Sequence, residues 1–300
     1  MERYSVHLKL LGMAVLWGAS WPMGRMLGQL LPPLTGGAVR FVLASVLLLG
    51  WLFARSRFAT LAALSARQWL GLTVAASVGV CGYAVFFMLG LQTMPAGKAA
   101  VVVAVTPVLT LLLATWFFGE RLNAKILAGM LLAVGGAIMV VTQGQPLTVL
   151  SGGTKAGEWL IFGCVVCWAA YTLIGRAVLR GIDALTVTTA TSFIGALMLS
   201  VVALWTDGMP FEAIAAMDGR GWTALAWLVI GATVLAYAWY FEGVKTLGAG
   251  SAAAYITLVP IFGVLSSAWF LGEPLHISLV AGCAAAVGGM TLMRYGQKAV

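Results

Sequence analysis

Long runs of apolar residues dominate this chain and decide which solvent it can fold in. The run AAVVVAVTPVLTLLLATWFF at 99–118 contains no charged side chain, and about 20 apolar residues are what one helix needs to cross a bilayer. Charged residues make up 9% of the chain and apolar residues 62%, whereas a soluble domain carries about 25% charged residues. Such a chain cannot cover a water-facing surface, so the sequence predicts an integral membrane protein.

The same runs predict an all-α bundle of ten transmembrane helices. A membrane β-barrel would show stretches of about 10 residues that alternate between polar and apolar, and the run at 99–118 does not alternate. The ten predicted helices cover residues 8–28, 35–54, 69–92, 97–118, 122–142, 157–176, 185–205, 221–243, 250–271 and 275–294. The first helix is expected to be retained rather than cleaved as a signal peptide, because no small-residue cleavage site follows it.

The excess of positive charge is interpreted as a topology signal. The chain has 17 Lys and Arg residues and 9 Asp and Glu residues. With a cytoplasmic N-terminus, 12 of the 17 fall in cytoplasmic segments and 5 at external helix ends or loops, as the positive-inside rule requires. Both termini are therefore predicted to lie in the cytoplasm, and the charge implies no nucleic-acid partner.

The second half of the chain repeats the first. FFGERL at 117–122 returns as FLGEPL at 270–275, an offset of 153 residues. Further pairs at this offset are Pro107 and Pro260, Gly129 and Gly282, Gly135 and Gly288, and Gly136 and Gly289, and at an offset of 151 Trp17 aligns with Trp168. We therefore predict two five-helix units, one at 8–143 and one at 157–295.

An odd number of helices in each unit makes the two units inverted. The second unit enters the membrane from the opposite side, so the first of the two repeated turns is cytoplasmic and the second external. Arg121 then follows the positive-inside rule, and Pro274 avoids breaking it. Inverted repeats are typical of secondary transporters that bind a substrate near the midplane, between the two halves.

These motifs resemble those of the drug/metabolite transporter superfamily, with two EamA-type repeats. The matching stretches are WGASW at 17–21, PLTGGAVRF at 33–41 and the two Pro…Gly-Glu…Gly…Gly-Gly runs that begin at Pro107 and Pro260. Within the superfamily, the tryptophan-rich sequence is similar to the YddG-type exporters of aromatic amino acids. The resemblance implies a secondary transporter of a bacterial inner membrane that exports small amphipathic metabolites, above all aromatic or hydrophobic amino acids, without a cofactor or metal.

Aromatic and small polar side chains are the candidates for substrate binding, because the helix centres hold almost no ionisable residue. Aromatic rings offer stacking surface together with an N–H or O–H group, which suits a flat, partly apolar ligand. The predicted substrate-binding residues are Trp17, Ser20, Trp21, Tyr83, Phe87, Thr106, Trp168, Tyr171, Tyr237, Phe241 and Thr257. The alternatives are packing or an interfacial belt for the rings, and a bond to the helix backbone for the hydroxyls.

Two prolines fall inside predicted spans. Pro107 and Pro260 each remove one backbone hydrogen bond and are expected to kink the helix. We predict that these helices line the pathway and bend during transport, with a static kink as the alternative. A helix kinked in this way leaves a carbonyl to be satisfied, often beside a cavity.

The ionisable residues of the spans lie near predicted helix ends, where they can reach the interface. Arg40 has no counterpart in the second half, so any role it has cannot be mirrored there. The spans contain no chain of acidic or His residues of the kind that relays protons. Proton coupling is therefore either absent or dependent on a residue such as Glu242.

Several other features are interpreted as structural. The small-residue stripes AGMLLAVGG and AGCAAAVGG are predicted to pack helices closely. Glu120 and Glu273 are predicted to complement the dipoles of the helices that follow them. Cys164 and Cys167 form a Cys-x-x-Cys motif inside an apolar helix, outside the context of a redox site.

Three classes of function are compared. An exporter of amphipathic amino acids is favoured over a drug-type exporter of aromatic cations, because a cation exporter would benefit from a carboxylate at the helix centres. An intramembrane enzyme is ranked last, because His7 and His276 are the only histidines and the chain has neither HExxH nor a P-loop. The expected partners are the lipid bilayer and a small molecule. A monomer is expected, although glycine faces serve dimer contacts as well.

Overall fold

The chain is helical throughout the part that the structure describes. The computed structural model describes residues 2–55, 58–119, 122–145, 156–178, 181–247, 252 and 255–297. Within these ranges there is no β-strand, which confirms the predicted all-α class. Eight helices of this part are long and apolar enough to cross a membrane, so the count of ten remains a prediction.

The helix boundaries follow the predicted spans closely. The first half contains α1 (Glu2–Leu30), α2 (Pro33–Ala54), α3 (Phe58–Ala62), α4 (Ala66–Ala76), η1 (Ser77–Gly82), α5 (Tyr83–Thr93), α6 (Ala96–Val103), α7 (Thr106–Phe118) and α8 (Ala124–Val141). The second half contains α9 (Ala156–Val178), α10 (Ala184–Thr206), α11 (Phe211–Ala215), α12 (Gly219–Ala226), η3 (Trp227–Leu235), α13 (Ala236–Leu247), α15 (Val259–Leu271) and α16 (Ile277–Gln297). The short helices α3 and α11 were not predicted.

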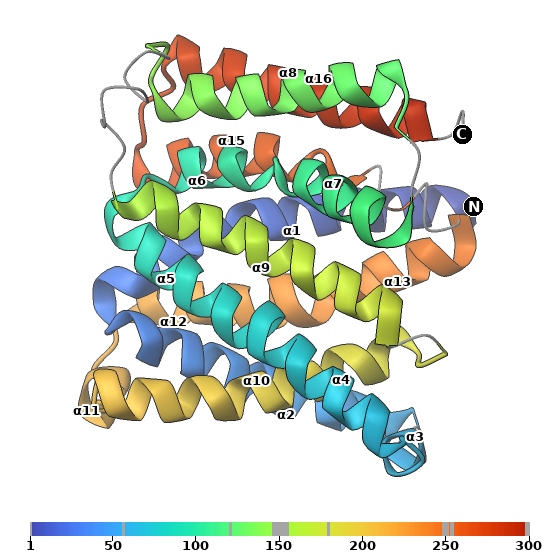
Figure 1. Ribbon diagram of the computed structural model, residues 1–300. Helices are drawn as coiled ribbons and strands as arrows, with labels where there is room; N and C mark the ends of the chain where they lie inside the picture. The colour runs from blue at the N-terminus through green and yellow to red at the C-terminus, as the bar shows by residue number, and fades with distance from the viewer. Residues whose placement is uncertain are drawn as a thin grey trace.

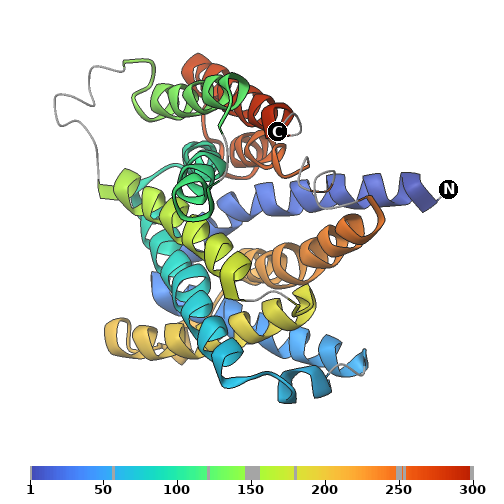
Figure 2. The ribbon, with the colours of Figure 1, turned by 45° about the vertical axis from the view of Figure 1, so that its right-hand side comes forward.

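The long helices run side by side across the bundle (Figure 1). Helices α8 and α16 pair along one edge, and α2 and α10 pair along the opposite edge. The start of α1 and the end of α16 lie at the same end of the bundle in both views (Figures 1 and 2). We call this end the terminal side and the opposite end the far side.

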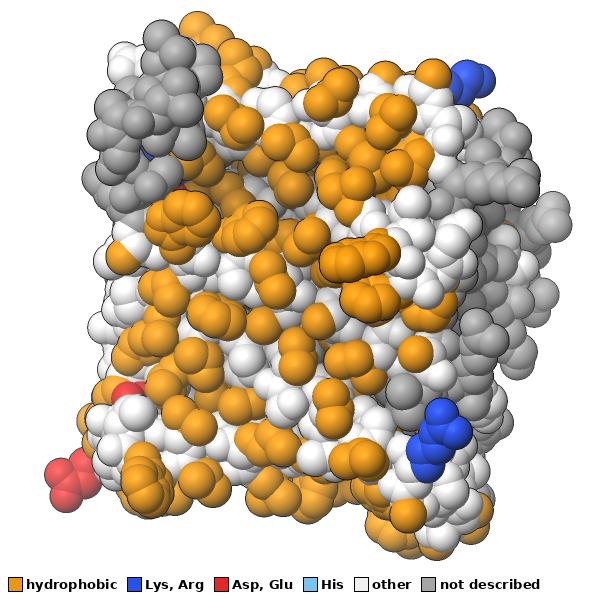
Figure 3. Space-filling model, in the orientation of Figure 1, with side chains coloured by type: hydrophobic (Ala, Val, Ile, Leu, Met, Phe, Trp, Pro, Cys, Tyr) orange, Lys and Arg blue, Asp and Glu red, His pale blue; other side chains and the backbone are white. Residues whose placement is uncertain are grey.

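The outer surface of the bundle is apolar along the length of the helices. Hydrophobic side chains cover the visible face, and the charged side chains lie at its two margins, where the helices end (Figure 3). Trp116 and Trp269, which the repeat aligns, are 81% and 85% exposed. A water-soluble protein would bury such rings, so this surface is the one that meets lipid, in a multi-pass membrane protein.

Helices α8 and α16 cross at two equivalent contacts between glycines. A methyl group at Gly136 would lie 2.5 Å from the carbonyl oxygen of Gly282, and one at Gly129 would lie 2.6 Å from that of Gly289. The repeat aligns Gly129 with Gly282 and Gly136 with Gly289. The two contacts are therefore equivalent under exchange of the halves. Lipid offers no hydrophobic driving force between helices, so close backbone approach at small residues supplies the packing.

A π-helical segment interrupts the third span of each half. In the first half η1 joins α4 to α5, and in the second half η3 joins α12 to α13. Moved by the repeat offset of 153 residues, 77–82 falls on 230–235, inside η3. Such segments are rare and are found mostly at functional sites, and their equivalence shows that the duplication preserved this irregularity.

The two prolines break their helices rather than kink them. Helix α6 ends at Val103, the chain turns, and α7 begins with Pro107 as its second residue. Pro260 is likewise the second residue of α15. A proline in the first turn costs little, because its missing N–H has no partner there in any helix. Pro107 is exposed and Pro260 is buried, and bending during transport remains a prediction.

Glu273 binds a helix other than the one predicted. Its carboxylate oxygens accept hydrogen bonds from the backbone N–H groups of Ala96 and Gly97 at 2.8 and 2.9 Å, in the first turn of α6. Arg25 lies 3.6 Å from the same carboxylate and donates to the carbonyl oxygen of Met94 at 2.6 Å. The prediction that Glu273 serves the following helix is therefore wrong, because a carboxylate at the far side can reach across to the other half. Glu120 lies outside the described residues.

The glycine crossing can be tested with a neighbouring control. Gly136→Ala is expected to lower thermal stability, because its methyl group would meet the Gly282 carbonyl, and such overpacking costs about 1–3 kcal/mol. Gly135→Ala is the control, because nothing lies within 4 Å of a methyl group there. Unfolding is followed in detergent with a thiol-reactive dye, which reports exposure of the buried thiols of Cys164 and Cys283. Equal midpoints for the two variants would contradict the contact.

The carboxylate of Glu273 is also expected to stabilise the bundle. Glu273→Ala removes two hydrogen bonds to a charged group, each worth about 1.5–3 kcal/mol when broken. Its unfolding midpoint in the same dye assay should fall well below that of Glu212→Ala, which removes an exposed carboxylate on α11. Glu273→Gln should fall between the wild type and Glu273→Ala, because an amide oxygen can accept only one of the two bonds. A midpoint for Glu273→Ala equal to that of Glu212→Ala would refute the stabilising link between the halves.

Candidate substrate-binding site

Two equivalent tryptophan–tyrosine pairs join the two halves. Trp17 of α1 meets Tyr237 of α13 edge to face, with ring centroids 5.4 Å apart. Trp168 of α9 meets Tyr83 of α5 in the same manner at 5.7 Å. In each pair the tryptophan comes from one half and the tyrosine from the other. The tryptophans lie 151 residues apart and the tyrosines 154, one more than the 153-residue offset of the motifs that follow them. The structure therefore brings together four of the predicted residues in two similar contacts.

Further predicted rings extend this cluster within the first half. Trp21 and Phe87 lie 5.0 Å apart and are only 4% and 3% exposed. Phe87 also stacks on Tyr83 at 6.0 Å. Since Tyr83 contacts Trp168, these rings form a continuous aromatic surface from α1 through α5 to α9. We call the set Trp17, Trp21, Tyr83, Phe87, Trp168, Tyr171 and Tyr237 the aromatic cluster.

The second half contributes two further tyrosines. Tyr171 lies 5.8 Å from Trp168, and Tyr240, which was not predicted, lies 5.7 Å from Trp17.

The indole N–H of Trp17 donates to the carbonyl oxygen of Ala232 at 2.8 Å. Ala232 belongs to η3, where π-helical geometry leaves a carbonyl available. The π-helical segment thus has a direct role in orienting one ring of the cluster.

Two of the predicted hydroxyl groups bond to the backbone of their own helix. Ser20 donates to the carbonyl oxygen of Trp17 in its own helix, and Thr106 donates to that of Val103 at 2.6 Å. Both therefore follow the backbone-bonding alternative. Thr257 lies in the turn before α15, and the side chain of Phe241 lies outside the described residues.

The structure places Arg40 at the cluster, although sequence reasoning assigned it to a helix end. Arg40 is seven residues beyond the start of α2, which is about 10 Å along the helix at 1.5 Å per residue. Its guanidinium carbon lies 5.0 Å from the ring centre of Phe41 and 5.9 Å from that of Phe87. A single Arg inside an otherwise uncharged span, with no counterpart in the repeat, was the signal that could have identified it.

The charged side chains at the terminal side lie apart from the cluster. Glu242, near the end of α13, forms an ion pair with Lys9 of α1, with an N–O distance of 2.7 Å. His7 is hydrogen-bonded to the hydroxyl of Tyr255 at 2.7 Å. These contacts join the start of α1 to the second half. Glu242 is thus paired, which accounts for the one carboxylate that sequence reasoning considered for coupling.

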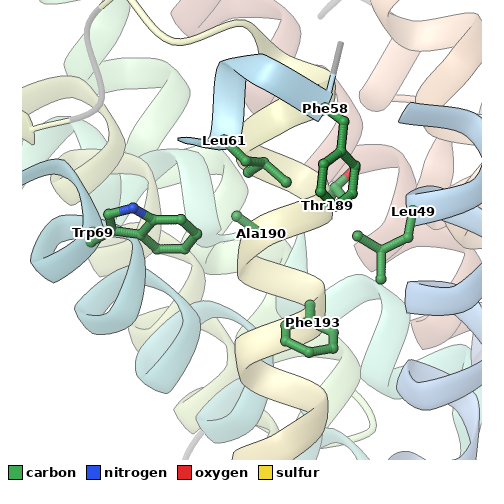
Figure 4. A pocket seen from close by; sticks show the side chains of 7 residues that line it. All are labelled: Leu49, Phe58, Leu61, Trp69, Thr189, Ala190 and Phe193. Atoms are coloured by element: carbon green, nitrogen blue, oxygen red, sulfur yellow. The ribbon is translucent and has the colours of Figure 1, made fainter. Parts of the chain in front are cut away.

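Two hollows of the surface contain no predicted site residue. The first, of about 240 Å³, is lined by side chains of α2, α3, α4 and α10 (Figure 4). Its residues are Leu49, Phe58, Leu61, Trp69, Thr189, Ala190 and Phe193. The second, of about 260 Å³, lies between α2 and the α12–η3 segment. Neither hollow is lined by a ring of the aromatic cluster.

The cluster offers no metal chemistry. Across the described residues, no group of three His, Cys, Asp or Glu side chains could hold a metal ion. All four cysteines are free, and Cys164 and Cys167 are buried. Cys164 contacts the carbonyl oxygen of Tyr83 at 3.8 Å. The arrangement therefore provides ring faces, tyrosine hydroxyls and one guanidinium, which are groups that bind a ligand without reacting with it.

Comparison with known proteins points to transport. The model of the EamA-like transporter family matches the chain twice, at residues 5–142 and 155–295. The chain is 28% identical over 291 residues to the uncharacterized transporter YyaM of Bacillus subtilis (strain 168), covering 97% of this chain and 93% of that protein. It is 26% identical over 220 residues to a probable terminal-alkyne amino-acid exporter of Streptantibioticus cattleyicolor, covering 73% of this chain and 71% of the exporter.

A solved structure supports the fold. One crystal structure superimposes with a TM-score of 0.64 over 96% of both chains, at 21% sequence identity. The two family matches lie within a few residues of the two predicted units and cover most of the chain. With the all-helical bundle, the apolar outer surface and the named relatives, they place the protein among membrane transporters rather than enzymes. The chain belongs to the EamA-like transporter family.

Proposed function

We propose that this protein is a secondary transporter that exports amphipathic amino acids with aromatic or hydrophobic side chains. The observation that carries this proposal is the tryptophan–tyrosine contact made twice between the halves. A contact made twice by inverted repeats is what alternating access requires, because the two halves then exchange roles around one central site. Rings with polar edges suit a ligand that is itself a ring or an apolar chain with a polar end.

The transport cycle follows from the same symmetry. Substrate separates one tryptophan–tyrosine pair while the other remains closed, and exchange of the halves reverses the two. The helix breaks before Pro107 and Pro260 and the segments η1 and η3 are the places where the backbone bends, because their hydrogen bonding is already irregular. Chain termini in the cytoplasm and a bacterial inner-membrane location complete the proposal. The similarity to an amino-acid exporter supports the substrate class.

Transport into liposomes tests this function. Purified protein is reconstituted, and uptake of labelled tryptophan, phenylalanine and a quaternary ammonium dye is followed with and without a pH gradient. Saturable amino-acid uptake is expected. Trp17→Ala and Trp168→Ala should each raise the half-saturation concentration about tenfold, since an aromatic contact contributes about 0.5–1.5 kcal/mol beyond its buried area and 1.4 kcal/mol is tenfold in affinity.

The repeat also provides matched controls for this experiment. Trp116→Ala and Trp269→Ala remove a pair of tryptophans that the repeat aligns and that face lipid, so they should leave the half-saturation concentration unchanged. Rates are normalised to folded protein, measured by dye reactivity of the buried thiols. Uptake of the dye alone, or equal effects of the inner and outer tryptophan pairs, would contradict the aromatic cluster as the site of an amino-acid exporter.

A further inference from the structure

Arg40 carries a charge that the described protein leaves unbalanced. Its Nε is buried and has no hydrogen-bond partner. No carboxylate of the described residues lies within ion-pair distance of its guanidinium, whereas Arg25 and Lys9 at the helix ends both have one. The side chain as a whole is partly exposed, but a buried N–H without a hydrogen bond is costly, and a charged side chain inside a membrane span is costly as well. The surroundings of Arg40 therefore need an explanation.

The neighbours of Arg40 compensate for only part of this cost. The rings of Phe41 and Phe87 lie within cation–π distance. Neutral rings attract a cation but do not neutralise it. Since Phe87 belongs to the aromatic cluster, the unbalanced charge lies beside the proposed ligand site.

A role in packing alone does not account for this arrangement. A helix-end anchor would direct its guanidinium toward water, but that of Arg40 lies against Phe87, which is 3% exposed. The position that the 151-residue offset assigns to Arg40 in the second half is Thr191, whose hydroxyl bonds the carbonyl oxygens of Val187 and Thr188. The equivalent position of the second half thus holds a neutral side chain. Packing of this helix therefore does not require a cation, although the first half has one.

We propose that Arg40 binds the carboxylate of the transported amino acid and makes the site selective for carboxylates over organic cations. This inference rests on the proposed function. The planar guanidinium matches a carboxylate through two parallel N–H···O bonds, and its free Nε is one of the donors that such a pair uses. The carboxylate neutralises the charge of Arg40, while the apolar part of the substrate contacts the aromatic cluster. A cationic amine without a carboxylate meets repulsion at the same place.

The asymmetry of Arg40 adds a mechanistic consequence. The tryptophan–tyrosine contacts are duplicated, so they can exchange between the halves, but the carboxylate ligand exists only in the first half. The substrate therefore stays attached to α2 through its carboxylate, and only the contacts around its side chain exchange. The second half, with Thr191 at the equivalent position, moves relative to this fixed attachment.

A panel of three indole compounds tests the proposal on the wild-type protein. Tryptophan has both charges, indole-3-propionate has only the carboxylate, and tryptamine has only the amine. Each competes with labelled tryptophan during uptake into liposomes, and each is assayed separately for thermal stabilisation of the protein in detergent. Tryptophan and indole-3-propionate should compete and stabilise, and tryptamine should do neither at about 10-fold higher concentration, since a hydrogen bond to a charged group has this weight. Equal action by tryptamine would overturn the proposal.

Substitutions of Arg40 provide a second test of the proposal. Arg40→Gln should raise the half-saturation concentration for tryptophan about 10- to 100-fold and abolish the advantage of indole-3-propionate over tryptamine. Arg40→Lys keeps the charge but loses the bidentate geometry, so it should keep the preference for carboxylates with weaker binding. Arg67→Gln, at an exposed arginine of α4, is the control and should match the wild type.

The two proposals fail in different ways. If the wild type transports tryptophan and folded Arg40→Gln transports it with unchanged half-saturation and unchanged preference, the role of Arg40 is wrong and the exporter stands. If the wild type transports none of the amino acids, the proposed function is wrong, and the stabilisation assay still decides whether Arg40 binds carboxylates. If the Arg40 variants do not fold, the wild-type panel alone decides the inference.

Discussion

Every feature of this bundle depends on the absence of water around it. In hydrocarbon, each backbone N–H and C=O must form its hydrogen bond within the protein. A chain this apolar therefore folds into α-helices, which satisfy these groups internally. Lipid also removes the hydrophobic force that packs helices in water, and contact must come from shape. The reciprocal approach of Gly129 to Gly289 and of Gly136 to Gly282 meets this need with backbone against backbone. The halves are thus joined by contacts that the duplication itself provides.

The duplication has a second consequence at the centre of the bundle. The same family model matches both halves, and contacts between the halves occur in similar pairs. The pairs Trp17–Tyr237 and Trp168–Tyr83 arise in this way, as do the two π-helical segments next to the tyrosines. The irregular backbone of η3 provides the carbonyl of Ala232 that orients Trp17. Irregular backbone inside a membrane is tolerated where it is buried in protein or lines a cavity.

The repeat does not preserve every residue at the centre of the bundle, and Arg40 is the example. Arg40 stands alone in the first half and brings the only unneutralised charge described at the aromatic cluster. The duplication provides repeated contacts between the halves, whereas the 151-residue offset assigns Thr191, a neutral residue, to the position of Arg40. Specificity in such a protein is therefore expected at the positions that the repeat does not preserve.

The sequence by itself determined the helical class, the approximate spans and the duplication, because hydropathy and the repeat offset are local properties of the chain. It also pointed to Trp17, Tyr83, Trp168 and Tyr237, which the structure brings into contact, since the repeat aligned the tryptophans and helical spacing put aromatic residues on shared faces. The tertiary structure alone decided which half each ring contacts, that Glu273 reaches α6 rather than α16, and that the helices break before Pro107 and Pro260. Arg40 illustrates the reason: its distance from a helix end is visible in the sequence, but the direction of its side chain is set by the packing of α2 against α5. Contacts between residues that are far apart in the chain depend on that packing, and no local pattern encodes them.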